Sequence, residues 1–190
     1  MTFYFDLSSP WTYLAAERVD RLFTGLRWVP VLGDALAAAG WPPALPVDAV
    51  REAAEDRAAA LRMPLVWPDP WPTGLSAMRV AALAAERGRA APFVLATGRL
   101  AFCGGYDIDD PETIAEAAAA AGLGLDEALA AARDHGRDGV LEQAGLRLLS
   151  RGGDALPALR VGRTLYCGEA RLPEAAAAAA VPLARRIARS

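Results

Sequence analysis

Apolar and polar positions alternate in short stretches at the two ends of the chain and follow a helical period between them. Residues 2–6 alternate aromatic with polar residues, which is typical of a short strand, and residues 11–24 have a helical pattern. Arg27–Val31 predicts a second strand, bounded by Gly25 and Gly33. Because strand–helix–strand crossovers are right-handed, the two strands are expected to be parallel.

From about residue 34 to residue 150 the pattern is almost entirely helical. The predicted helices cover Ala49–Leu61, Leu75–Arg87, Pro92–Phe102, Pro111–Ala121, Asp126–Ala132 and Gly139–Leu149. Asp110 before Pro111 is a typical helix start, with an acid at the cap and proline at the first position. Strands return at Pro157–Val161 and Thr164–Cys167, and a last helix runs from Pro173 to about Ile187.

This order of elements predicts an α/β chain with a thioredoxin-like fold and a large all-helical insertion. Residues 1–33 and 151–190 would form the thioredoxin-like domain, and residues 34–150 the inserted helical domain. A cleft between the two parts is the expected ligand site. Thioredoxin folds keep a cis proline before the third strand, so the Leu156–Pro157 bond is expected to be cis.

Thioredoxins carry a Cys-Pro-x-Cys motif at the start of their first helix, and this chain has Ser9-Pro10-Trp11-Thr12 there. Hydroxyls replace both sulfurs, which excludes thiol–disulfide exchange by Ser9 and Thr12. The free N–H groups of a first helical turn favour an anion and lower the pKa of a nearby thiol. Ser9 would therefore suit a thiolate supplied by another molecule, and a simple helix cap is the alternative interpretation.

The composition of the chain argues against several classes of function. The 190 residues carry a net charge of −3 and no basic cluster, which argues against nucleic-acid binding. No apolar run could span a bilayer and no signal peptide precedes the first strand, so we expect a cytoplasmic protein without a membrane partner. Cys103 and Cys167 lack CxxC spacing and are expected to be free thiols. With His135 as the single histidine, neither a zinc site nor a Ser–His triad is expected.

Four stretches resemble the 2-hydroxychromene-2-carboxylate isomerases and the related kappa-class glutathione transferases, members of the DsbA-like branch of the thioredoxin superfamily. They are FYFDLSSPWTYLA at the start, WPDPWPTGLSAMRVA at 67–81, GYDIDDPETIAEAAAAAGL at 105–123 and LPALRVGRTLYCGEARL at 156–172. The order and spacing of these stretches agree with the family over nearly the whole chain.

The resemblance implies glutathione, or another low-molecular-weight thiol, as cofactor, and no metal. It implies cis–trans isomerisation of a hydroxyaryl unsaturated keto-acid by reversible addition of a thiolate, with Ser9 as the catalytic residue. The residues expected to bind the thiol are Ser9, Pro10, Leu156, Pro157, Glu169 and Arg171; those expected to contact the small aromatic acid are Trp11, Trp67, Trp71 and Arg79. Packing is the alternative role for the tryptophans, and a solvated helix face or a structural ion pair is the alternative for Arg79.

Two departures from the family pattern bear on the thiol. The family's Gly-x-Asp-Arg, whose Asp holds the glutathione amino group, becomes Gly168-Glu169-Ala170-Arg171, so Glu169 is the carboxylate that could replace it. Gly40-Trp41-Pro42-Pro43 lacks the Asn of the family's Gly-Asn-x-Pro-Pro. A transferase that conjugates a thiol to an electrophile and a non-catalytic ligand-binding protein remain as alternatives. Dimers are common among relatives, and no feature of the sequence establishes one here.

Overall fold

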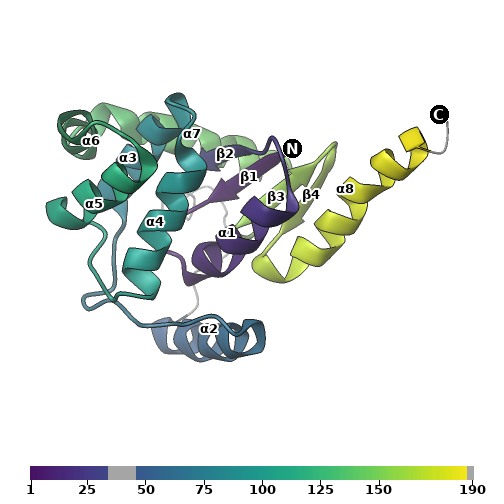
Figure 1. Cartoon of the computed structure of the whole chain (residues 1–190), viewed down its shortest axis with the longest axis horizontal. Coiled ribbons are helices and arrows are strands. Elements are labelled where there is room, and N and C mark those ends of the chain that lie inside the picture. Colours follow the sequence, from purple (N-terminus) through teal and green to yellow (C-terminus); the bar gives the residue numbers. More distant parts are fainter. Residues whose placement is uncertain (34–45, 188–190) are drawn as a thin grey trace.

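The structure is a computed structural model that describes residues 1–33 and 46–187, with side chains described up to residue 180 (Figure 1). In chain order, its elements are β1 (Thr2–Phe5), α1 (Pro10–Leu22), β2 (Arg27–Pro30), α2 (Val47–Leu61), α3 (Leu75–Glu86), α4 (Ala90–Phe102), α5 (Pro111–Ala121), α6 (Leu125–Ala132), η2 (His135–Arg137), α7 (Asp138–Leu149), β3 (Ala158–Val161), β4 (Thr164–Cys167), η3 (Glu169–Arg171) and α8 (Leu172–Ile187). The predicted helices and strands are all present, with ends within two residues of the expected ones.

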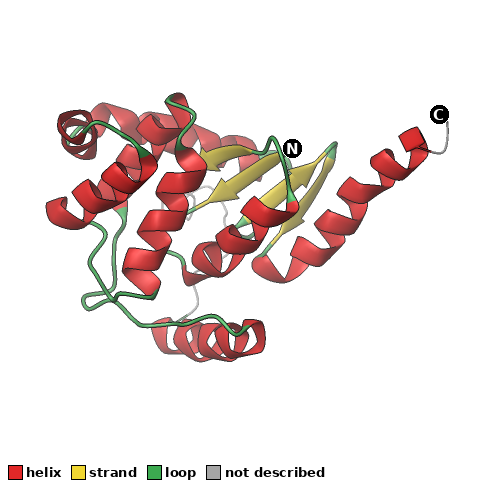
Figure 2. Cartoon of the chain, in the orientation of Figure 1, coloured by secondary structure: helices red, strands yellow, loops and turns green. Residues whose placement is uncertain are grey.

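The strands form one mixed sheet in the order β2-β1-β3-β4 (Figure 2). β1 pairs in parallel with β2, as the crossover rule predicts, and antiparallel with β3; β3 and β4 form the expected hairpin. Phe3 lies opposite Trp28 on one side and Leu159 on the other. The Phe3 and Trp28 rings meet edge to face, with centroids 4.9 Å apart.

The alternation expected for residues 2–6 is not an alternation between core and solvent. All four residues of β1 are buried, because this central strand has apolar clusters on both faces. Phe3 and Phe5 join the large cluster formed with α1, α3 and α4, whereas Tyr4 packs with Leu148 of α7 and Ala158 of β3. The strand therefore tolerates polar groups only where they find a partner.

The large apolar cluster extends from the sheet through α1 and α3–α6, so both predicted parts of the chain share one core. The boundaries proposed for the two domains stay a prediction. Figure 1 shows α2 apart from the layer formed by α3–α7, beside α1. Only Ala54 and Ala58 of α2 are fully buried. None of the described helices is long and apolar enough to cross a membrane.

Candidate functional site

Ser9 is the N-cap residue of α1, with extended backbone (φ −92°, ψ 123°), and Pro10 occupies the first helical position. The Ser9 hydroxyl makes no capping hydrogen bond to the first turn, so the simple helix-cap interpretation does not describe this side chain. Ser9 is partly exposed, whereas Pro10 is buried. The Ser9 hydroxyl is thus available to a ligand at the positive end of α1.

The turn before Ser9 is fixed by Asp6, which is buried. Its carboxylate accepts hydrogen bonds from the Ser8 amide (2.9 Å), the Ser8 hydroxyl (2.7 Å) and the Gly33 amide (2.8 Å). The Asp6 amide in turn donates to Thr12 Oγ1 at 3.3 Å. Thr12 is buried, so the second hydroxyl of the motif holds the turn in place.

The Leu156–Pro157 peptide bond is cis, as predicted. The Pro157 carbonyl accepts a hydrogen bond from the Gly168 amide at 2.8 Å. This contact joins the loop before β3 to the segment that follows β4. A second cis bond, Asp69–Pro70, was not predicted from the sequence.

A cavity of about 390 Å³ lies between α1, α2 and these two segments. Its lining consists of Trp11, Ala53, Arg57, Ala155, Leu156, Gly168, Glu169 and Ala170. The cavity lies between the thioredoxin-like elements and the first helix of the predicted insertion, which is where the ligand site was expected. Of the predicted site residues, Trp11, Leu156 and Glu169 line it, and Pro10 and Pro157 are their neighbours in the chain. Ser9, two residues before Trp11, is not in the described lining.

Glu169 is 4% exposed and holds the cavity wall together. Arg57 of α2 donates to it twice, from Nε to Oε2 at 2.7 Å and from Nη2 to Oε1 at 3.0 Å, and Arg18 of α1 also donates to Oε1. The hydrogen bond to Glu169 raises the pKa of Arg57 against the opposing effect of burial. Arg18 and Arg57 were missed in the sequence, because nothing local marks two arginines whose partner lies more than a hundred residues away.

Arg171, expected to bind the thiol, is exposed and does not line the cavity. It pairs with Glu174 at 2.7 Å and lies over the ring of Tyr166.

Trp67 and Trp71 also lie outside the cavity lining. Their rings stack on each other with centroids 5.4 Å apart, and the Arg51 guanidinium lies over both at 5.6 and 5.7 Å. Trp67 Nε1 donates to Glu55 at 2.6 Å. The two tryptophans thus fasten α2 to the proline-rich loop, which is the packing role considered as the alternative.

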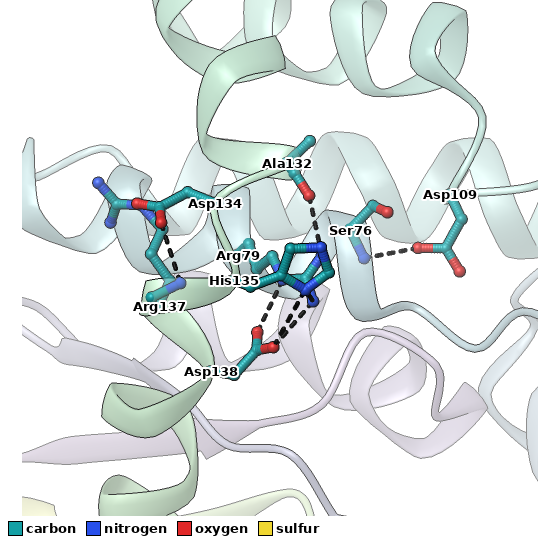
Figure 3. Close-up of polar contacts among 9 residues, drawn as sticks. Ser76, Arg79, Asp109, Ala132, Asp134, His135, Arg137 and Asp138 are labelled. Atoms are coloured by element: carbon teal, nitrogen blue, oxygen red, sulfur yellow. Dashed lines mark hydrogen bonds and ion pairs between the residues drawn. The ribbon is translucent and has the colours of Figure 1, made fainter.

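Arg79, expected to meet a substrate carboxylate, instead meets one from the protein (Figure 3). It is 4% exposed and donates to both oxygens of Asp138, from Nε at 2.7 Å and from Nη2 at 2.8 Å. It also contacts the Ala132 carbonyl at 3.2 Å and Nδ1 of the exposed His135 at 2.8 Å. The structure therefore shows Arg79 in the structural ion pair considered as the alternative, and the substrate-binding role stays a prediction.

Cys103 and Cys167 are free, as predicted. Cys103 Sγ lies 3.0 Å from the Tyr13 hydroxyl, and burial raises the pKa of Cys167.

Within residues 1–33 and 46–180, no group of three or more His, Cys, Asp or Glu side chains could hold a metal ion. The Trp41 segment, with its missing Asn, lies outside the described residues. A larger cavity of about 610 Å³, between β2, α3 and α7, contains none of the predicted site residues.

Solved structures share this fold. A 2-hydroxychromene-2-carboxylate isomerase (HCCA isomerase) aligns with a TM-score of 0.84 at 19% identity, covering 100% of this chain and 98% of its own. A probable DsbA oxidoreductase from Streptomyces coelicolor gives 0.69 at 19% identity (94% and 87% covered). A putative protein disulfide isomerase from Nitrosomonas europaea gives 0.64 at 14% identity (87% of each).

No curated protein matches the sequence. A protein-family model described as a DSBA-like thioredoxin domain matches residues 1–178. That match spans the sheet, helices α1–α7 and the residues that line the cavity between α1 and α2. The chain belongs to the family of DSBA-like thioredoxin domains.

Proposed function

We propose that this protein is a thiol-dependent cis–trans isomerase of a hydroxyaryl unsaturated keto-acid. The observation that carries the proposal is the Ser9 hydroxyl, which starts α1 without capping it, two residues before Trp11 of the cavity wall. The similarity in fold to the HCCA isomerase supports the same reaction class. The cavity volume of about 390 Å³ is in the range of small-molecule sites.

The bound thiol would supply the nucleophile. A thiolate beside Ser9 accepts a hydrogen bond from the hydroxyl and is stabilised by the N-terminal dipoles of α1. Both interactions favour the anion over the neutral thiol, so the pKa of the bound thiol falls and more of it is reactive at neutral pH. The protein itself needs no reactive cysteine for this step.

The chemistry then balances without an oxidant. The thiolate forms a bond to the conjugated carbon, and the alkene electron pair moves through the conjugated system to the carbonyl oxygen as an enolate. The former double bond rotates as a single bond. The enolate electrons return, the carbon–sulfur bond breaks, and the thiolate leaves unchanged from the other alkene isomer. The half-exposed indole of Trp11 is the wall against which a flat aromatic acid would lie.

Ser9→Ala tests the proposal. A hydrogen bond to a charged group is worth about 1.5–3 kcal/mol, so the variant should raise the pKa of the bound thiol by about one to two units. Turnover at pH 7 should fall about 10- to 100-fold and recover at higher pH. The measurement is the isomerisation rate, followed by absorbance against pH at saturating thiol.

Ser8→Ala is the matched control, because the Ser8 hydroxyl donates to Asp6 rather than to a ligand. Its pH–rate profile should keep the wild-type pKa of the bound thiol. Equal profiles for Ser9→Ala and wild type would contradict the proposal. The concentration of free thiol is measured before and after the reaction. Consumption of one thiol per product would identify a conjugating transferase at the same site.

A further inference from the structure

The charges around Glu169 do not cancel. One carboxylate faces two guanidinium groups, those of Arg18 and Arg57, and both of its oxygens accept hydrogen bonds from them. The three groups together carry one net positive charge. Arg57 and Glu169 are the charged side chains in the described lining of the cavity and balance each other, so the excess positive charge is that of Arg18, which contacts Glu169 from outside the lining.

Arg57 brings the positive charge to the cavity surface. Its side chain is 32% exposed, whereas that of Glu169 is 3% exposed. Nε and Nη2 of Arg57 are used by Glu169. Within the described part of the chain, no hydrogen bond uses Nη1, which leaves these donors for a ligand carboxylate.

A ligand ammonium has no corresponding partner in the described lining. The Glu169 carboxylate is buried under two cations, and the next residue, Ala170, contributes only a methyl group to the wall. An ammonium placed here would lose water without gaining a carboxylate and would face a guanidinium of the same sign.

We propose that this cavity selects acidic thiols that lack a free ammonium group, the class of cysteine peptides whose terminal amino group is acylated. Ala170 and the paired Glu169 are the residues that determine the selection. This inference rests on the proposed function, because it assumes that the thiol whose sulfur lies at Ser9 occupies this cavity. It specifies which thiol the isomerase uses.

The test is calorimetric titration with glutathione and with N-acetylglutathione, which differs from glutathione by one acetyl group that removes the charge of the amino group. The wild-type protein should bind N-acetylglutathione at least about ten times more tightly. Ala170→Asp places a carboxylate on the same wall and should raise the affinity for glutathione about tenfold while leaving that for N-acetylglutathione unchanged or lower. Ala170→Asn is the matched control of equal size without charge, and should not change the preference.

Equal affinity of the wild-type protein for the two peptides overturns the inference, and so does the absence of binding by either. The same pair of peptides with alanine in place of cysteine separates this inference from the proposed function. If the N-acetylated alanine peptide binds as tightly as its thiol and keeps the preference over its amine, the selection stands and the role of the thiol fails. If both thiols bind equally and each has a lowered thiol pKa, the isomerase proposal keeps its support and the selection fails.

Discussion

Arg79 and Glu169 are both buried charges, and their partners differ in number. Arg79 meets a single carboxylate, Asp138, and the pair is neutral. Glu169 meets two guanidiniums, and the group keeps a positive charge. At the scale of single residues, the first arrangement stabilises the packing of α3 against α7, and the second leaves one positive charge next to the cavity wall.

Replacing Arg79 with Leu should lower the free energy of unfolding by about 3 kcal/mol, because it leaves the half-buried Asp138 carboxylate without its partner. Arg79→Lys keeps the charge but not the two-pronged geometry, and should recover only part of the loss. Urea unfolding at pH 7 measures both variants. A loss below 0.5 kcal/mol for Arg79→Leu would contradict a structural role.

The same pair predicts a pH dependence. Arg79 holds the pKa of the Asp138 carboxyl below its usual 3.8 in the folded protein. Its contribution to stability is therefore complete at pH values above the unfolded pKa and is lost as the pH falls through the lowered folded pKa. Asp138→Asn should remove this contribution, so the difference in unfolding free energy between wild type and variant should shrink as the pH is lowered from about 5 toward about 2.

At the scale of elements, α1 and α5 begin with the same pattern and differ in what the cap does. The Asp110 side chain accepts hydrogen bonds from the Glu112 and Thr113 amides, whereas the Ser9 side chain accepts none from α1. Asp110→Ala should cost about 1 kcal/mol of stability, and Ser9→Ala less than about 0.5 kcal/mol. Urea unfolding of the two variants checks the contrast. A loss at Ser9 as large as that at Asp110 would make Ser9 a structural cap.

Most element boundaries could be predicted because local chemistry fixes them. Asp110-Pro111 starts a helix, and Gly162, with φ 60°, allows the tight turn between β3 and β4. The pattern was misleading for residues 2–6, where alternation indicates which of two buried faces a residue meets. The period alone cannot distinguish a central strand that is covered on both faces from a strand with one face in solvent.

The site could be predicted only as far as it is local. Trp11 and Leu156 follow from a helix start and a proline loop that the fold brings together. The partners of Arg79 and of Glu169 lie 59 and more than 100 residues away, and no periodicity encodes such pairs. The sequence therefore indicated where charges are, and the structure was needed to say which of them are already neutralised.

At the scale of the whole molecule, Glu169 connects three elements that are not adjacent in the sequence. It fastens η3 to α1 through Arg18 and to α2 through Arg57. α2 lies apart from the other helices of the predicted insertion (Figure 1). Glu169→Gln leaves two partly buried guanidiniums facing a neutral amide, which should cost about 2–3 kcal/mol.

Hydrogen exchange should find this loss concentrated in α2, because that helix has few other buried contacts, while amides of β1 keep their protection. Glu174→Gln removes an exposed pair from the same region of the chain and serves as the control, with little change expected. Uniform loss of protection over α2 and β1 would contradict a local fastening role for Glu169.

The position of β1 inside the sheet has a consequence for synthesis. β1 is made first, and its partner β3 follows about 150 residues later. At 5–20 residues per second, one edge of this apolar strand stays unpaired on the ribosome for about 8 to 30 s. An exposed strand edge pairs readily with other chains. The nascent protein therefore depends on its own long helical segment, or on a chaperone, to cover Phe3 and Phe5 until the last strands emerge.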